Sequence, residues 1–213
     1  MFLVRAFIAA ATVSFAAAAD VPTPPRTNQT NLPPPGPELF NASTRVAISA
    51  PIDTVWAAVL DFPSYPSWNP FVRSAVLTDD AFIPLPASEQ TVAENIRAVF
   101  QVQIPPLPLP VSASTPSDPL HAQISFENIT HLEPDLYRVA WKQIALPDAV
   151  LSAERWSAVS VIAVGPDANK TLYESREAYS GALAPELQVL YEQGLQEAFD
   201  AQAVALKGLL EGQ

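Results

Sequence analysis

The side chains best suited to chemistry lie in a short alternating segment, residues 171–179. In an extended strand, alternate side chains share one face. That rule groups four polar or aromatic residues on the same side, namely Tyr173, Ser175, Glu177 and Tyr179. A carboxylate on an inward face costs several kcal/mol unless it is paired or protonated. Glu177 is therefore predicted to be a polar anchor or a general acid/base in an apolar pocket, with Tyr173 or Tyr179 beside it.

A structural reading of the same acid stays open. Glu177 could form an ion pair with an inward arginine, for which Arg97 and Arg155 are the candidates, or could accept a hydrogen bond from a tyrosine. Buried ion pairs also perturb carboxyl groups, so an inward acid alone does not establish catalysis.

Aromatic residues elsewhere could line such a pocket. Trp68 and Phe71 flank a proline-rich connection, and Asn69 between them could offer a polar contact to a ligand or cap the turn. Trp141 shares a strand face with Tyr137 and Val139 and could form a pocket wall or pack against a helix.

Several kinds of chemistry are excluded. The chain has no cysteine, which removes disulfides, thiolate metal sites and a cysteine nucleophile. His121 and His131 would lie ~33 Å apart on one unbroken strand, so they cannot share a metal. Six scattered glycines form no phosphate-binding loop, and no nucleophile elbow or zincin helix occurs. We therefore expect no cofactor and no metal.

The pattern of apolar residues predicts the elements that position these side chains. Residues 51–60 have helical spacing, and a turn signal joins two of the predicted strands at residues 132–135. The predicted strands cover residues 43–49, 71–78, 95–103, 121–131, 136–142, 151–164 and 171–179.

The last predicted element is a helix from about residue 184 to 210, which at 1.5 Å per residue would be ~40 Å long. Its apolar stripe, which includes Tyr191 and Phe199, must lie along an apolar surface, and these two residues are candidates to face a ligand. Hairpin-connected strands followed by one long helix predict an α+β fold, in which a curved antiparallel sheet of six to seven strands wraps around the helix. The gap between them is a natural apolar pocket.

The N-terminal region and one connection have a different composition. Residues 1–19 have one early arginine, then an apolar run that ends in three alanines, which predicts a secretory signal peptide. Seven prolines in residues 20–39 predict a disordered, unpacked tail, and residues 104–119 form a proline-rich insertion in a domain spanning residues 40–213.

The remaining signals favour export. The sequence carries four Asn-x-Ser/Thr triplets, at Asn28, Asn41, Asn128 and Asn169, which are candidate glycosylation sites behind the signal peptide. A glycan on Asn128 requires that side chain to point outward, which places Glu127 inward unless a bulge resets the register.

The net charge of −11 disfavours nucleic-acid binding. No segment after the signal peptide is long and apolar enough to span a membrane.

Taken together, the folded part resembles a START-like domain of the helix-grip kind. That superfamily includes polyketide cyclases and aromatases, coenzyme-Q-binding proteins, birch-pollen-allergen-like proteins and lipid-transfer domains. The resemblance covers about residues 44–211, and it rests on residues 48–56, 61–71, 177–181 and 205–207 together with Trp141.

The resemblance implies a binding or carrier protein for a small hydrophobic ligand such as a lipid, sterol, isoprenoid or aromatic polyketide. With the predicted signal peptide, we expect a secreted, monomeric protein. A cyclase or aromatase that uses the same pocket, without metal or nucleotide, is one alternative, and it would need a second titratable group facing Glu177. A secreted interaction protein with a vestigial pocket is the other.

Overall fold

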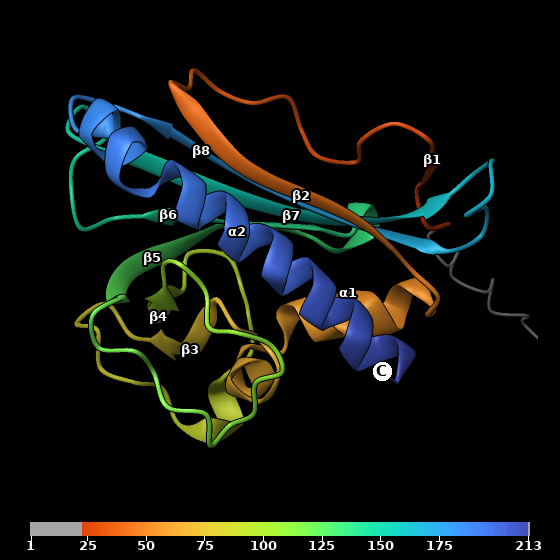
Figure 1. Cartoon of the computed structure of the whole chain (residues 1–213), viewed down its shortest axis with the longest axis horizontal. Coiled ribbons are helices and arrows are strands. Elements are labelled where there is room, and N and C mark those ends of the chain that lie inside the picture. The colour runs from red at the N-terminus through yellow and green to blue at the C-terminus, as the bar shows by residue number, and fades with distance from the viewer. Residues whose placement is uncertain (1–22, 213) are drawn as a thin grey trace, which may run out of the picture.

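The structure, a computed structural model, describes residues 23–212 (Figure 1). The signal peptide predicted for residues 1–19 lies outside these residues. The first helix, α1, spans Ile52–Leu60 and is followed by a 3-10 helix over Phe62–Ser67, and the long helix α2 spans Ala184–Glu211. The strands are β1 (Arg26–Thr27), β2 (Phe40–Ile48), β3 (Val72–Thr78), β4 (Arg97–Gln103), β5 (Ala122–Glu133), β6 (Arg138–Gln143), β7 (Ser152–Ile162) and β8 (Thr171–Ser180).

The strands form one curved sheet in the order β2-β8-β7-β6-β5-β4-β3, and each neighbouring pair is antiparallel. The short β1 is added in parallel to β7. α2 crosses the concave face of this sheet diagonally (Figure 1). The α+β helix-grip architecture expected from the sequence is therefore confirmed.

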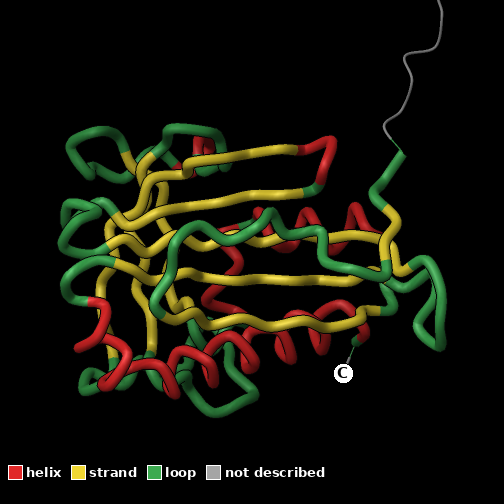
Figure 2. Tube along the Cα trace, turned by 90° about the horizontal axis from the view of Figure 1, so that it is seen from above, coloured by secondary structure: helices red, strands yellow, loops and turns green. Residues whose placement is uncertain are grey.

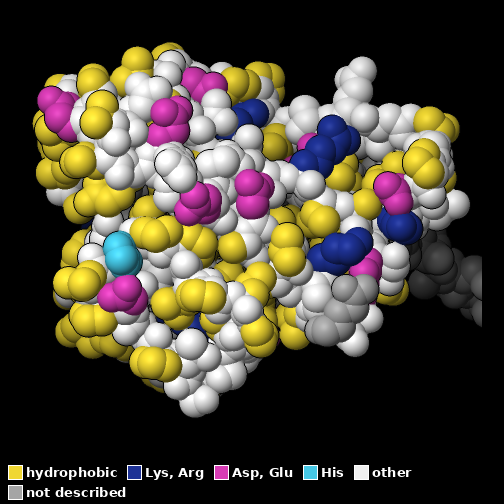
Figure 3. Space-filling model, in the orientation of Figure 1, with side chains coloured by type: hydrophobic (Ala, Val, Ile, Leu, Met, Phe, Trp, Pro, Cys, Tyr) yellow, Lys and Arg dark blue, Asp and Glu magenta, His cyan; other side chains and the backbone are white. Residues whose placement is uncertain are grey.

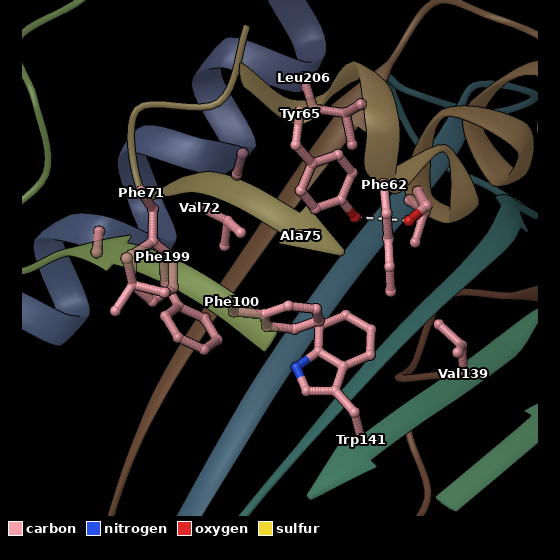
Figure 4. Close-up of a cluster of buried hydrophobic side chains, with 14 of the residues drawn as sticks. Phe62, Tyr65, Phe71, Val72, Ala75, Phe100, Val139, Trp141, Phe199 and Leu206 are labelled. Atoms are coloured by element: carbon pink, nitrogen blue, oxygen red, sulfur yellow. Dashed lines mark hydrogen bonds between the residues drawn. The ribbon is translucent and has the colours of Figure 1, made fainter. Parts of the chain in front are cut away.

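The core forms where α2, α1 and the 3-10 helix meet the concave face of the sheet. Leu195, Phe199 and Leu206 recur at helical spacing along α2, and all three are buried. Beneath them, aromatic rings meet edge to face: Phe62 contacts Phe100 and Trp141 at ring-centroid distances of 5.3 Å and 5.7 Å (Figure 4). This packing holds one half of α2 tightly against the sheet.

The connection between α1 and β3 is fixed by the polar groups of its own turn. Asn69 is fully buried, and its Oδ1 accepts hydrogen bonds from the backbone N–H groups of Phe71 (2.9 Å) and Val72 (3.0 Å). The Tyr65 hydroxyl donates to the carbonyl of Val59 (2.6 Å; Figure 4). These bonds set the point at which β3 enters the sheet.

The N-terminal segment differs from the unpacked tail that its prolines predict. Its described part, from residue 23, lies along the outer face of the sheet (Figure 2). Asn31 is buried there, and its Nδ2 donates to the carbonyls of Leu136 (2.9 Å) and Val159 (2.8 Å). Proline lacks a donor but keeps its carbonyl acceptor. The Pro25 carbonyl accordingly accepts from the Val161 N–H at 2.8 Å.

The same segment covers a carboxylate. Glu174 points to the outer face, as strand alternation predicts, but it is only 3% exposed because the N-terminal segment lies over it. It accepts a hydrogen bond from the backbone N–H of Asn31 (2.8 Å) and pairs with Arg45 at 3.7 Å. Glu174 therefore lies on the outer face of the sheet without being exposed to solvent.

The proline-rich insertion packs against the rest of the molecule. Buried Arg73 donates to the carbonyls of Ser112 (2.8 Å) and Thr115 (3.3 Å) from Nη2. At the start of the insertion, Ile104 lies so close to α2 that a Cβ added to Gly194 would be 3.0 Å from its Cγ2. The insertion thereby closes one side of the space beneath α2.

Candidate functional site

A cavity of about 280 Å³ lies between the concave face of the sheet and the N-terminal half of α2. Its walls are largely apolar, with contributions from β3, β4, β6 and α2, including Phe71, Phe100, Val102, Trp141, Leu187 and Leu195. The gap predicted between sheet and helix is therefore present. On the face of the molecule that carries α2, hydrophobic side chains gather over the region of β3, β4 and the proline-rich insertion, and acidic ones lie along α2 (Figures 1 and 3).

Strand register brings the polar groups of the cavity together. On the inward face, Trp141 lies opposite Arg155, and Arg155 lies opposite Glu177 on the next strand. One step along the strands, Glu127 lies opposite Gln143. Because the sheet curves around the cavity, side chains from four strands converge on it, and all five of these residues line its wall.

Arg155 is held rigidly at the base of this cluster. It is 2% exposed; its Nε donates to Ser175 Oγ (2.9 Å) and its Nη2 to Gln202 Oε1 of α2 (3.0 Å). Its guanidinium carbon lies 4.1 Å from the centroid of the Phe199 ring, which is a cation–π contact. Arg155 thus ties α2 to the sheet and places a fixed positive charge beside the two acids.

The two carboxyl groups are strongly perturbed by this environment. Burial, reinforced by the Glu177 charge, raises the pKa of Glu127 to about 8, although the Ser125 hydroxyl and Arg155 act in the opposite direction. Burial also raises the pKa of Glu177, and here the Arg155 charge and the hydrogen bond with Tyr179 oppose the rise. Tyr179 is itself buried, and burial and the Glu177 charge raise its pKa. At neutral pH the cavity therefore holds a proton on Glu127.

The residues predicted from the sequence to bind a ligand divide into two groups. Five of them line the cavity: Phe71, Trp141, Glu177, Tyr179 and Tyr191. The other four, Trp68, Asn69, Tyr173 and Phe199, lie outside its lining, and each has a structural environment.

Those four residues belong to the core. Trp68 packs edge to face on Tyr65 at 5.1 Å, and Asn69 caps the turn as described above. Tyr173 is fully buried with its hydroxyl 3.4 Å from the Gln202 amide, and Phe199 supports Arg155 from below.

The main residue missed as a site candidate is Glu127. The sequence carried the signal, because an outward Asn128 places Glu127 inward, and the structure buries both Glu127 and Ile129. Arg155, one of the two predicted ion-pair partners of Glu177, lies opposite it on β7, but among the ion pairs of residues 23–212 none joins the two. Arg97, the other candidate, pairs instead with Asp80 at 3.3 Å.

The histidines stay away from this site. His121 pairs with Asp118 at 2.7 Å, and the exposed His131 lies 4.7 Å from the ring of Trp156. Within residues 23–212, no group of three or more histidine or acidic residues could hold a metal ion. Over the same residues, no helix has both the length and the apolar character needed to cross a bilayer.

Comparison with known proteins supports the fold. A family model described as polyketide cyclase / dehydrase and lipid transport matches residues 40–103, and a search of curated proteins finds no match. Truncated norcoclaurine synthase from Thalictrum flavum is 11% identical, with a TM-score of 0.51, and the match covers 82% of this chain and 94% of that one.

Two further solved structures are similar at lower scores. A START superfamily protein from Mycobacterium smegmatis is 18% identical over 81% of this chain and 97% of that chain, with a TM-score of 0.49. The Zhui aromatase/cyclase from Streptomyces sp. R1128 is 15% identical over 81% and 93%, also with a TM-score of 0.49.

Proposed function

We propose that this chain, which has the START-like helix-grip fold, is a secreted carrier that binds one small hydrophobic molecule in the cavity beneath α2. The observation that carries the proposal is the cavity itself, whose apolar walls end in a few convergent polar groups, an arrangement typical of small-molecule sites. Apolar burial would supply the affinity, and Glu127, Glu177 and Arg155 would orient the ligand.

The volume narrows the class of ligand. About 280 Å³ lies just below the usual range of ligand pockets, which is roughly 300–1,000 Å³. A fused-ring aromatic or a medium-length chain suits this space better than a complete sterol. The proline-rich insertion and Tyr191 of α2 bound the cavity on two sides, so a longer ligand would have to extend out of its mouth.

Secretion and a monomeric state are part of the proposal. The first nineteen residues have the pattern of a signal peptide, and the chain has no cysteine that would have to be kept reduced or paired. Asn28, Asn41 and Asn169 have exposed side chains, which suits glycans on the surface.

Titration with a neutral fluorescent dye, N-phenyl-1-naphthylamine, tests the carrier proposal. We expect saturable binding at one site per chain, competition by medium-chain lipids, and loss of binding in Ala153→Trp, which places an indole in the cavity. Ala87→Trp, at an exposed position outside the lining of the cavity, is the control and should retain binding. Mass spectrometry of extracts from the secreted protein would then identify a retained ligand. The absence of saturable dye binding by the wild-type protein would refute the proposal.

A cyclase or dehydratase activity is the second candidate, and the pair Glu127 and Glu177 favours it. Glu127 keeps its proton and could act as a general acid. Glu177 is hydrogen-bonded and lies near a guanidinium, so it could act as the general base. With aromatic polyketide substrates, Glu127→Gln and Glu177→Gln should each lower turnover by about 100-fold or more while dye binding persists. Turnover that survives both substitutions would exclude this activity.

A further inference from the structure

The cavity holds more acidic groups than basic ones. Glu127 of β5 and Glu177 of β8 are the acidic residues of its lining, and Arg155 of β7 is the basic one; α2 adds only the phenol of Tyr191 as a titratable group. Tyr179 faces the same space, and Ser125 donates to Glu127. If both carboxyl groups are ionised, the cavity of the described chain therefore carries one negative charge in excess.

Arg155 makes no direct ion pair with either acid. Two of its nitrogens are committed to Ser175 and Gln202, and its guanidinium lies over Phe199. Among the ion pairs of residues 23–212, none joins Arg155 to either glutamate. Without a ligand, the excess is removed by the proton that Glu127 keeps.

A ligand can replace that proton. A carboxylate ligand would add a third negative charge in a poorly hydrated space, and it would be repelled. A neutral alcohol or ketone would leave the proton where it is and would use only one of the two acids. An ammonium group would allow both glutamates to ionise, which makes the cavity neutral.

We propose that the natural ligand of this cavity carries a basic amine at one end of an apolar body, and that its ammonium group binds between the carboxylates of Glu127 and Glu177. The inference rests on the proposed carrier function. The ammonium forms hydrogen bonds with the two carboxylates, and the apolar body lies against Trp141 and Leu195. Binding is coupled to release of the Glu127 proton to the solvent, because that carboxyl must ionise to accept the ammonium.

Three probes that share one decyl chain test the head group: decylamine, 1-decanol and decanoate. Isothermal titration calorimetry of the full secreted protein at pH 7 should show decylamine binding at least tenfold tighter than decanol, with decanoate weakest. The enthalpy of decylamine binding should differ between phosphate and Tris buffers by the amount expected for proton release, and that of decanol should not.

Variants assign the effect to the two acids. Glu127→Gln and Glu177→Gln should each reduce the preference for decylamine over decanol to about twofold or less. Glu154→Gln is the control, because Glu154 is the neighbour of Arg155 on β7 and bonds to Thr130 outside the cavity, so this variant should keep the preference. Equal binding of decylamine and decanol by the wild-type protein, or a preference that survives both cavity substitutions, would overturn the amine inference and leave the carrier function intact. If no probe binds, the carrier function itself fails.

Discussion

At the scale of single residues, the protonation states of two glutamates determine the charge of the cavity. Glu127 and Glu177 are both enclosed, and one fixed guanidinium is shared between them. Two buried acids of this kind destabilise a fold that has no ligand unless a proton remains on one of them. Glu127 retains it, and this has a measurable effect on stability.

Stability should fall as pH rises through the neutral range. The pKa of Glu127 is about 8 in the folded protein and about 4.3 in the unfolded chain, so between these values the native state binds a proton that the unfolded state has lost. The free energy of unfolding then decreases by up to about 1.4 kcal/mol per pH unit. Urea denaturation at pH 5 and pH 8 should show this loss in the wild type and a flatter dependence in Glu127→Gln, which should be the more stable protein at pH 8. An unchanged slope in the variant would contradict the assignment.

Asn69 should matter for stability and not for ligand binding. Replacing it by alanine leaves two buried backbone N–H groups, those of Phe71 and Val72, without their acceptor, which costs about 1–3 kcal/mol. Thermal unfolding should detect this loss, while the affinity of the folded variant for N-phenyl-1-naphthylamine should stay within twofold of wild type. A large loss of affinity in the folded variant would show that Asn69 belongs to the ligand site.

Strand alternation predicted the inward acid and tyrosine correctly because it depends only on local backbone geometry. Glu177 and Tyr179 both line the cavity as expected. Alternation does not report depth along the sheet, and for that reason Tyr173, on the same face, lies in the core instead of the cavity. Strand alternation could not predict the role of Arg155, because that role depends on a hydrogen bond with Gln202 of α2, which is distant in sequence.

At the scale of elements, the N-terminal segment is the largest departure from expectation. Its prolines predict an unpacked chain, yet a single buried Asn31 and a few carbonyl acceptors fasten it to β7, to β8 and to the turn before β6. A prediction from proline content considers the backbone N–H groups that proline lacks, but not the backbone carbonyl groups that can still accept hydrogen bonds. The two helices and the seven long strands were predictable because their apolar periodicity is strong.

Asn31→Ala should loosen this segment. The substitution leaves the carbonyls of Leu136 and Val159 without a donor and removes the acceptor of Arg138, so the free energy of unfolding should drop by about 2 kcal/mol or more. Limited proteolysis should cut the variant faster than the wild type between residues 23 and 39. Gln29→Ala, at an exposed position two residues earlier, serves as the control and should behave like the wild type.

The turn that leads into α2 depends on Gly181. Its φ of 102° is unfavourable for other residues, and an added Cβ would lie 2.8 Å from the carbonyl oxygen of Val150. Gly165 has a similar φ of 100° with open space around it, so Gly165→Ala should cost only about 1–2 kcal/mol from the backbone. Gly181→Ala should cost clearly more in denaturant titrations and should weaken dye binding, because the strand that follows Val150 borders the cavity. Equal losses in the two variants would show that the contact with Val150 is unimportant.

At the scale of the whole molecule, export and glycosylation depend on which asparagines are accessible. Asn28, Asn41 and Asn169 are exposed, whereas Asn128 is half-buried beside β6 with its Nδ2 3.4 Å from the Ile129 carbonyl. After expression in a eukaryotic secretory host, peptide N-glycosidase treatment and mass spectrometry should show modification at the first three positions and little at Asn128. Full occupancy at Asn128, or retention of the protein inside the cell, would contradict this prediction.

The long helix is secured unequally along its length. Toward its C-terminal end, Gln202 accepts a hydrogen bond from Arg155 and Lys207 donates to the Ala47 carbonyl at 2.6 Å. At the other end Ala184 is buried and the Leu183 N–H donates to the Val150 carbonyl at 2.9 Å, while Leu187 and Tyr191 between the two ends border the cavity. Under the proposed carrier function, exchange of a bound molecule would accordingly require the stretch around Leu187 and Tyr191 to bow away from the sheet while both ends of the helix stay in place. The residence time of a bound molecule would then be set by how often the helix bows, and a substitution that stiffens this stretch would slow both uptake and escape.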